Sequence, residues 1–354
     1  MSSRTRLAGV AAVAAIAVMA MAAAASARTL VVTPGHSIQK KIDKANAGDT
    51  VIVQDGTYRE SLDINKRLHL AGQGAILTEG APGHTLCNSM PGPDLVGICV
   101  HGKLKFSGGG APKIVHRVRG IEISGFRVRG FSAEGIFGFG TRGLRVHNNR
   151  LAHNGGYGLF SLNGGHVHLV HNVARGNGAP GLYVGDSPNA RAEIRGNRSV
   201  RNGGEGILLR HASIGVVRRN VLAHNCIGLM VLADAPGPAG SFTISGNRVV
   251  NNNKACKGDP DEGLPPMSGV GIALLGAHDT VVKNNVVRNQ SAAHASFIHG
   301  GIVVGRGIRG TPPRADRIFG NVSLGNSPDV FWDSSGSVRF HSNLCRTSRP
   351  GSVC

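Results

Sequence analysis

Large aromatic side chains are scarce in this chain, in which Phe, Trp and Tyr make up 4% of 354 residues. Aromatic rings supply much of the buried surface of ordinary globular cores, so their shortage argues against one wide core. Glycine is abundant instead, with 53 residues. Many glycines and few rings favour short strands joined by tight turns, which is a reason to look for internal repeats.

Acidic residues are also few, with 20 Asp and Glu against 39 Lys and Arg, and the formal net charge is +19. A protein this basic attracts polyanions, such as acidic polysaccharides, anionic wall polymers, lipid and nucleic acid. Charge alone does not choose among them, and we expect no specific nucleic-acid partner. Because the basic residues are scattered through the sequence, a merely solubilising surface is an equal alternative.

Long apolar runs are absent after residue 27. The first residues carry Arg4 and Arg6, then an apolar run that ends in Ala25-Ser-Ala27, which is the pattern of a secretory signal peptide cleaved after Ala27. An uncleaved membrane anchor is the alternative, although the run is short for a spanning helix. We therefore expect a secreted protein with no membrane span after cleavage and a net charge of +17, from 37 basic and 20 acidic residues.

A repeated phrase runs through the middle of the chain. It contains an anchor asparagine, a second amide five residues later and then a Gly-aliphatic pair, and an aliphatic residue stands three positions before each anchor. An earlier unit has Phe126 and Phe131 in place of the two amides. The anchors are Asn149, Asn172, Asn197, Asn220, Asn247, Asn285 and Asn321, spaced 23, 25, 23, 27, 38 and 36 residues apart.

A unit this short holds strands that cannot bury a face alone, so each unit must stack on copies of itself. The aliphatic columns would fill a narrow interior, and the anchor asparagines would hydrogen-bond from coil to coil as a structural ladder rather than bind a ligand. Leucine-rich repeats share the period but need a denser leucine pattern. The repeat therefore predicts an all-β, single-stranded parallel β-helix of roughly ten coils, with strands about 4.8 Å apart.

The N-terminal part adds a second motif. Residues 37–45, SIQKKIDKA, have the spacing of an amphipathic helix, and residues 48–60, GDTVIVQDGTYRE, follow it. Together with the repeat at 121–336, this motif resembles the pectin lyase-like superfamily of right-handed parallel β-helices.

The resemblance implies that residues 37–45 form a helix that caps the open end of the stack, where an uncovered strand edge would be sticky. We expect one β-helix domain over 28–354, with the cap and first coils at 28–120, regular repeats at 121–336 and a C-terminal cap at 337–354. One scaffold hosts many activities, so the fold does not determine the reaction.

In catalytic members of this superfamily, the active groups lie on the outer face of the strand that begins with the Gly-aliphatic pair and on its flanking loops. The outward column of this strand is apolar, and sugar-binding candidates in it are Phe137, Phe160 and Tyr183. The alternative is that loops or a partner cover the column. The insertions at 253–268, 291–299 and 306–316 are expected on the same side, as a cleft wall.

Stacking also brings together polar residues that are distant in sequence. Asp186 and His211 both lie five residues after a strand glycine, so they should be neighbours. Arg210 faces outward beside them, and Glu205 precedes the strand. These four catalytic candidates suit proton abstraction from a uronic acid, with the cation neutralising the sugar carboxylate. The alternative is a chance meeting of polar residues at coil corners.

Motifs of the better-defined relatives are absent. The chain lacks the paired Asp of polygalacturonase-type hydrolases, the Asp-Phe-Ile-Phe-Gly of pectin methylesterases and the Asp-Pro-His-Asp of alginate epimerases. We expect no cofactor. Calcium is the one metal considered, with Asp259, Asp261 and Glu262 as weak ligand candidates and a solvated loop as the alternative.

Six cysteines without CxxC or Cys/His zinc spacing predict disulfides in an exported chain. Cys226 and Cys256 follow the second amides of consecutive coils, so stacking places them within bridging range. The pairs Cys87–Cys99 and Cys345–Cys354 are then assigned by elimination.

These patterns predict a secreted β-helix protein that binds an acidic polysaccharide, a polyuronate, with cleavage or epimerisation as the reaction considered. The alternative is a non-catalytic cell-surface or wall-associated β-helix module that docks a protein or wall polymer. The sequence leaves open whether the chain is an enzyme.

Overall fold

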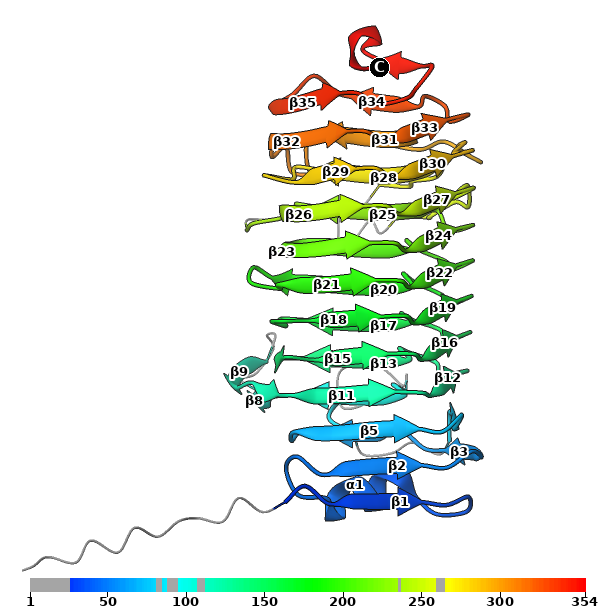
Figure 1. The fold of residues 1–354 in the computed structure, drawn as a ribbon, viewed down its shortest axis with the longest axis vertical. Helices are drawn as coiled ribbons and strands as arrows, with labels where there is room; N and C mark the ends of the chain where they lie inside the picture. The colour runs from blue at the N-terminus through cyan, green and yellow to red at the C-terminus, as the bar shows by residue number, and fades with distance from the viewer. Residues whose placement is uncertain (1–25, 81–84, 88–94, 107–111, 235–236, 259–264) are drawn as a thin grey trace, which may run out of the picture.

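The computed structural model describes residues 26–80, 85–87, 95–106, 112–234, 237–258 and 265–354. Most of the expected signal peptide lies outside these ranges, and so do Asp259, Asp261 and Glu262. The described chain winds into a rod of stacked coils, with β1 at one end and the C-terminus at the other (Figure 1). Each coil contributes strands to three faces, which we call sheets A, B and C.

Sheet A is parallel throughout, and its strands stack in chain order. They are β1 (Thr29–Val32), β2 (Thr50–Val53), β5 (Leu68–Gly72), β11 (Ile121–Ser124), β15 (Arg145–His147), β18 (His168–Val170), β21 (Ala192–Arg195), β23 (Ile207–Arg218), β26 (Gly240–Ser245), β29 (Val281–Lys283), β32 (Arg314–Phe319) and β35 (Ser337–His341).

Sheet B follows sheet A in the coil and is also parallel. Its strands are β3 (Thr57–Arg59), β6 (Ile76–Thr78), β12 (Arg127–Arg129), β16 (Arg150–Ala152), β19 (Val173–Arg175), β22 (Arg198–Val200), β24 (Val221–Ala223), β27 (Arg248–Val250), β30 (Val286–Arg288) and β33 (Val322–Leu324).

Sheet C completes each coil, and β23 continues from it around the corner into sheet A. Its other strands are β4 (Leu62–Ile64), β7 (Ile98–His101), β13 (Ile136–Phe139), β17 (Leu159–Leu162), β20 (Leu182–Ser187), β25 (Ile227–Leu232), β28 (Val270–Leu275), β31 (Gly300–Gly305), β34 (Val330–Trp332) and β36 (Ser348–Arg349).

The remaining elements are short. An antiparallel pair, β8 (Lys103–Lys105) and β9 (Lys113–His116), projects from the rod, and β10 (Val118–Arg119) pairs with β14 (Thr141–Arg142). A 3-10 turn, η2 (Gly351–Val353), lies near the C-terminus. Within the described ranges, no helix has the length and apolar character needed to cross a bilayer.

Sheet B has 10 strands among the described residues, in agreement with the roughly ten coils predicted, and sheet A has 12. The two additional strands of sheet A are β1 and β35 at the ends of the rod, neither of which is followed by a strand of sheet B.

Columns of aliphatic side chains fill the interior, as predicted. In sheet A, Val146 pairs in register with Leu169, which pairs with Ile194. The column continues through later coils, and each member has 0% exposure: Val146, Leu169, Ile194, Val217, Ile244, Val282 and Ile318. Each such side chain contributes about 1.5–3 kcal/mol from burial.

A row of asparagine side chains runs along the corner between sheets A and B. The backbone N–H and the side-chain Nδ2 of Asn197 both donate to Oδ1 of Asn220, at 2.9 Å and 3.0 Å. Nδ2 of Asn197 also donates to the carbonyl of Leu169, at 2.8 Å. The same pattern joins all seven anchors, each at most 2% exposed. It extends beyond Asn321 to Asn343, which the repeat did not predict.

A second row of amides runs along the corner between sheets B and C. It consists of Asn154, Asn177, Asn202, Asn225, Asn252, Gln290 and Asn326. At the N-terminal end of the rows, the backbone N–H groups of Phe126 and Phe131 donate to Asn149 and Asn154, at 3.0 Å and 3.2 Å. The rows thus satisfy buried backbone donors that no strand partner reaches.

The first coil is closed by α1 (Ile38–Lys44), with Ile38 and Ile42 buried. Ser37 accepts a hydrogen bond from the Lys40 N–H at 3.2 Å, and Glu60 accepts one from the Ile38 N–H at 2.7 Å. A carboxylate at this end also complements the helix dipole. The predicted capping helix is therefore present.

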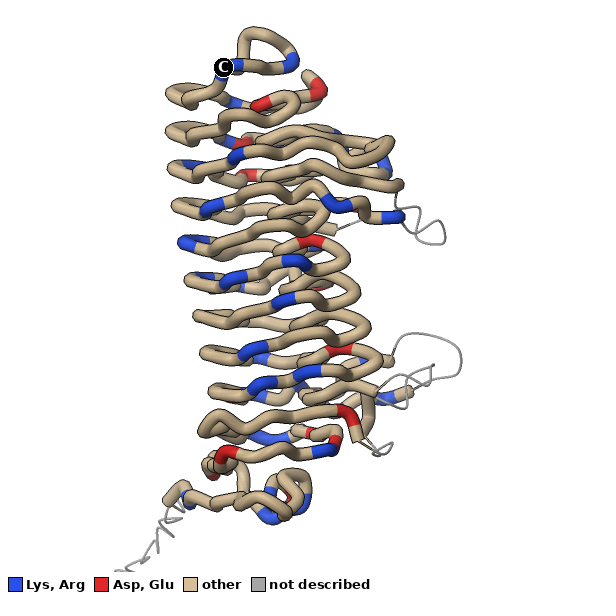
Figure 2. Tube along the Cα trace, turned by 90° about the vertical axis from the view of Figure 1, so that its right-hand side faces the viewer, with Lys and Arg blue, Asp and Glu red and all other residues tan. Residues whose placement is uncertain are grey.

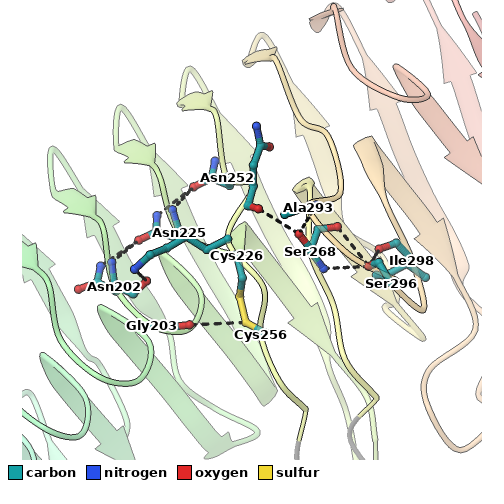
Figure 3. Close-up of a disulfide and its surroundings, with 12 residues drawn as sticks. Asn202, Gly203, Asn225, Cys226, Asn252, Cys256, Ser268, Ala293, Ser296 and Ile298 are labelled. Carbon is teal, nitrogen blue, oxygen red and sulfur yellow. Dashed lines mark hydrogen bonds between the residues drawn. A yellow bond between two sulfur atoms is a disulfide. The ribbon is translucent and has the colours of Figure 1, made fainter.

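Three disulfides join the pairs expected from the sequence: Cys87–Cys99, Cys226–Cys256 and Cys345–Cys354. Figure 3 shows the Cys226–Cys256 bridge beside Asn202, Asn225 and Asn252 of the second amide row. The bridge ties the start of the insertion at 253–268 to the coil below it.

Replacing Asn220 with Ala should destabilise the protein by about 3 kcal/mol, because the four buried hydrogen bonds of its side chain are lost. These bonds join it to the N–H and Nδ2 of Asn197, the carbonyl of Ile194 and Oδ1 of Asn247. Urea unfolding measures the loss. The control is Arg219→Ala, an exposed change at the same corner that should shift stability by less than about 0.5 kcal/mol. Equal losses would contradict the ladder.

Candidate functional site

The corner where sheet C turns into sheet A holds a cluster of polar side chains. Gly185 pairs with Arg210 and Ser187 with Ala212, so Asp186 lies beside His211. Both turn residues have left-handed backbone angles, with φ of 46° and 47°. Oδ1 of Asp186 lies 3.4 Å from Nδ1 of His211. The structure therefore brings this pair together.

Asp234 completes the cluster from the next coil. Its Oδ2 lies 2.7 Å from a terminal nitrogen of Arg210, and its Oδ1 accepts a hydrogen bond from Nε of Arg210 at 3.0 Å. Oδ1 also lies 2.8 Å from Nε2 of His211. The Asp234 side chain is only 3% exposed, against 51% for Asp186. His211 thus has a carboxylate at each ring nitrogen, one buried and one open to solvent.

Sequence reasoning missed Asp234 because it lies six residues after its strand glycine, Gly228, rather than five. A signal was nevertheless present, since Asp234 is the first acidic residue after the strand Ile227–Leu232 and belongs to the coil that follows His211. A search that allowed five or six residues between the strand glycine and the polar residue would have included Asp234.

Arg210 also affects the pKa values of two buried acidic groups near it, the Tyr183 phenol on β20 and the Glu205 carboxyl before β23. Burial raises the pKa of Tyr183 above its ordinary value, against the charge and hydrogen bond of Arg210, so the phenol stays neutral. Burial raises the pKa of Glu205 to about 7, against a hydrogen bond from its own backbone N–H and the charge of Arg210. Glu205 is 7% exposed, so a substrate in solution does not reach it in this structure.

The expected aromatic column is present but does not offer three open ring faces. Phe160 stacks on Phe137 with ring centres 4.9 Å apart and on Tyr183 with ring centres 4.7 Å apart. Phe137 and Tyr183 are only 5% and 4% exposed, because Cys87, Val96 and Cys99 pack on the first and neighbouring side chains pack on the second. Only Phe160 is partly open, so stacking of sugars along all three rings is corrected to a single possible contact.

The described residues of the insertions fold onto sheet C and do not form a cleft wall. Cys256 and Met267 from the first, Ile298 from the second and Ile308 from the third pack on the outer face of sheet C. Ser268 and Ser296 join the first two insertions, as Figure 3 shows, with the Ser268 N–H donating to Ser296 at 2.8 Å. The outer column beneath, with Met230 and Val303, is buried. The outward column of sheet C is therefore covered by loops, which is one of the two alternatives given for it above.

One group of possible metal ligands lies elsewhere in the described chain, formed by Asp63, Cys99 and His101. Cys99 is bonded to Cys87, and a disulfide sulfur is a poor ligand compared with a thiolate. Asp63 and His101 pair directly, with 2.9 Å between Oδ1 and Nε2. We interpret the group as a structural pair beside a disulfide.

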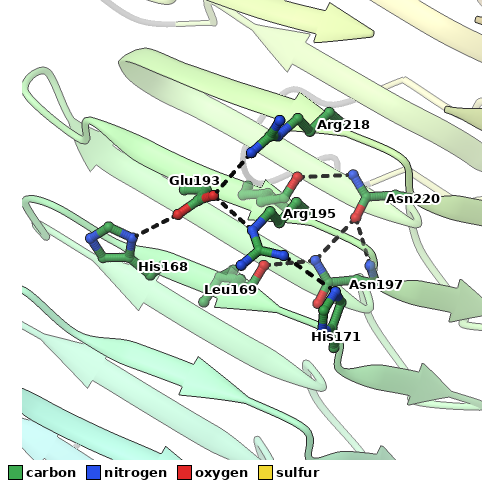
Figure 4. A network of polar contacts seen from close by, with 9 residues as sticks. His168, Leu169, His171, Glu193, Arg195, Asn197, Arg218 and Asn220 are labelled. Carbon is green, nitrogen blue, oxygen red and sulfur yellow. Dashed lines mark hydrogen bonds and ion pairs between the residues drawn. The ribbon is translucent and has the colours of Figure 1, made fainter. Parts of the chain in front are cut away.

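A second polar network lies on the outer face of sheet A (Figure 4). Oε2 of Glu193 lies 3.2 Å from Nδ1 of His168, and Oε1 accepts from Nε of Arg195 at 2.8 Å. Arg218 lies 3.5 Å from the same carboxylate. Burial raises the pKa of Glu193, but the hydrogen bonds from His168 and Arg195 lower it by more. These contacts cross adjacent strands and stabilise the sheet surface.

The family model described as "Right handed beta helix region" matches residues 114–309. Among solved structures, the A-module of mannuronan C-5 epimerase AlgE4 from Azotobacter vinelandii is similar at a TM-score of 0.59 and 17% identity, over 88% of this chain and 91% of that chain. The A-module of AlgE6 from the same organism is similar at a TM-score of 0.55 and 17% identity, over 88% and 93%.

The periplasmic alginate epimerase AlgG is similar at a TM-score of 0.57 and 12% identity, over 90% of this chain and 84% of that chain. No curated protein matches the chain in sequence. At these identities the likeness concerns the fold, which is the right-handed parallel β-helix of pectin lyase-like proteins predicted from the repeat and the N-terminal motif.

Replacing Glu205 with Gln should stabilise the protein at pH 8 by about 1–3 kcal/mol and change little at pH 4. The pKa of Glu205 is about 7 in the folded state and 4.5 ordinarily, so between these values the folded state retains a proton that the unfolded state loses. Stability therefore falls as pH rises through this window. Urea midpoints at the two pH values measure the effect.

The matched control is Glu193→Gln, which removes a carboxyl whose pKa is lowered. This variant should lose stability at pH 8 and keep it well below pH 4, the opposite sign. A Glu205 variant with no pH-dependent gain would contradict a buried acid at this position.

Proposed function

Because the chain belongs to the right-handed β-helix family, we propose that it binds a polyuronate and acts on it at the cluster of Asp186, Arg210, His211 and Asp234. The observation that carries the proposal is the position of His211, with a buried carboxylate at Nε2 and a half-exposed one at Nδ1. A base oriented by a buried carboxylate, with a half-exposed carboxylate at its second ring nitrogen, is an arrangement suited to proton abstraction.

The substrate class is supported by the structurally similar proteins, three of which are named as epimerases of mannuronan or alginate. Polyuronates carry one carboxylate on each ring, and the high positive charge of the chain suits such polymers.

The reaction begins at C5 of a uronic acid, where the adjacent carboxylate acidifies the C–H bond. His211 takes the proton at Nδ1 in the tautomer whose Nε2–H donates to Oδ1 of Asp234, and the half-exposed Asp186 gives way to the sugar ring. The backbone nitrogen of Asp234 lies 3.1 Å from the same Nε2 and donates no hydrogen bond to it in this tautomer. Arg210, whose side chain is 24% exposed, supplies positive charge where negative charge grows on the substrate carboxylate.

Two outcomes follow from the carbanion-like intermediate. In epimerisation, a proton returns to C5 from the opposite face and no bond in the chain breaks. In a lyase reaction, the C5 electron pair forms a C4–C5 double bond, the C4–O bond breaks, and the leaving oxygen takes a proton. Both share the first step, so one set of residues serves either.

The other candidates take supporting roles in this proposal. Phe160 contributes a ring edge near the site, while the buried Tyr183 and Glu205 act through Arg210 rather than on the sugar. No cofactor is invoked. We also propose that the chain is exported, which its three disulfides support.

The alternative function is a non-catalytic module that docks a protein or wall polymer. Docking through the apolar column of sheet C is disfavoured, since the insertions bury that column. The remaining alternative is that the protein binds an anionic wall polymer without reacting with it. The experiment below distinguishes such binding from catalysis.

Replacing His211 with Gln should reduce exchange of the C5 proton on short oligouronates by about 100-fold or more, because the proton acceptor is lost. Incubation in heavy water followed by proton NMR detects deuterium at C5 for an epimerase and a new vinyl proton for a lyase, so one assay covers both outcomes. Mannuronate, guluronate and galacturonate oligomers serve as substrates.

The control is His224→Gln, the same change at another left-handed position, with φ of 59°, at the corner between sheets B and C. It should keep full activity. Equal activity of the His211 variant and the wild type, or no exchange by the wild type on any oligomer, would contradict the catalytic proposal.

A further inference from the structure

Basic side chains gather on the outer face of sheet B, although they are scattered in the sequence. Figure 2, which faces this side of the rod, shows Lys and Arg on successive coils. We define the arginine strip by the outward positions of the strands and the adjoining corners. Its members are Arg127, Arg129, Arg150, Arg175, Arg198, Arg201, Arg219, Arg248 and Arg288, all exposed except the half-buried Arg175.

The strip has no negative charge of its own. The coil segments that form it are 126–131, 149–154, 172–177, 197–202, 219–225, 247–252, 285–290 and 321–326, all described, and they contain no Asp or Glu. Among the described residues, no carboxylate lies within ion-pair distance of these nine guanidinium groups. The strip therefore presents uncompensated cations, whereas Arg210 and Arg195 are paired with carboxylates.

The cations are arranged along the rod axis. Arg127 pairs in register with Arg150, and single coils carrying Val173 and Val221 separate Arg150, Arg198 and Arg248. With strands about 4.8 Å apart, cations follow one another at roughly 5–10 Å along this column. A second column through Arg129, Arg175 and Arg288 runs beside it.

We propose that the arginine strip binds a linear acidic polysaccharide lying along the rod axis. This site is separate from the cluster of Asp186, Arg210, His211 and Asp234, here called the Arg210 cluster. The choice of polymer rests on the proposed function, while the location rests on charge and geometry. A polyuronate carries one carboxylate per ring, and a linked pyranose ring advances the chain by a distance close to the strand spacing, so its charges match the strip over several coils.

Other polyanions fit the strip less well. Single-stranded nucleic acid needs aromatic side chains on which bases stack, and the two aromatic residues in these segments, Phe126 and Phe131, are buried. Binding to a membrane surface gains much of its strength from exposed apolar groups that insert, and the strip presents only half-buried valines between its arginines.

The position of the strip gives it a distinct role. The Arg210 cluster lies at the corner between sheets C and A, and sheet B is the third face of the rod. A polysaccharide bound along sheet B would hold other polysaccharide strands of the same gel or wall near the Arg210 cluster. The strip would thereby raise the local concentration of substrate at that cluster.

The test compares two triple variants of equal charge. The strip variant carries Arg150→Ser, Arg198→Ser and Arg248→Ser, and the control carries Arg145→Ser, Arg317→Ser and Arg339→Ser, three exposed arginines of sheet A. Binding to immobilised polymannuronate and polygalacturonate is measured over a range of salt around 0.15 M. The strip variant should bind about tenfold or more weakly and with a shallower salt dependence, while the control keeps wild-type affinity.

Equal losses in the two variants, or unchanged affinity of the strip variant, would overturn the strip as a site. Tighter wild-type binding to duplex DNA or to phosphatidylserine vesicles than to both polyuronates would overturn the choice of polymer. C5 exchange on short oligouronates is measured in parallel, where the strip variant should equal the wild type. Binding without exchange would refute only the catalytic proposal, and exchange without strip-dependent binding would refute only the strip.

Discussion

The register between consecutive coils is the constraint on which the structure depends. It is set by parallel backbone hydrogen bonds and by two rows of buried amides, each amide satisfying groups on the coils on either side. A slip of one residue would leave these donors and acceptors without partners in a dry interior. The spacing between anchors can therefore stretch from 23 to 38 residues while Asn247 still bonds to Asn285.

The faces of the rod differ in polarity and exposure because different connecting segments flank each sheet. Sheet C lies next to the long insertions, which fold down on it and bury its apolar column. The corner after sheet C has left-handed turns that present short polar side chains, and there Asp186, His211 and Asp234 meet. Sheet B, enclosed between two tight asparagine corners, has no room for insertions and stays flat and basic.

Most of the fold could be predicted because it repeats. The aliphatic columns, the ladder, the Cys226–Cys256 pair and the contact of Asp186 with His211 all follow from equal offsets in consecutive coils. Asp234 was missed because it lies one position further along its coil than Asp186 and His211 do in theirs. The burial of Phe137 and Tyr183 depends on loops that do not repeat, so no offset predicts it. Seven of the nine strip arginines stand at the first or third position after Phe126 or an anchor asparagine, and this pattern became informative only once these positions were known to face outward.

The most direct test of the register is a double-mutant cycle between His211 and Asp234, which lie in successive coils and are 23 residues apart in sequence. Unfolding free energies are measured for His211→Gln, Asp234→Asn and the double variant. Stacked coils predict a coupling free energy of about 1 kcal/mol or more, because the two side chains touch. Additivity within about 0.3 kcal/mol, as for residues far apart, would contradict the placement of these coils and of the site built on them.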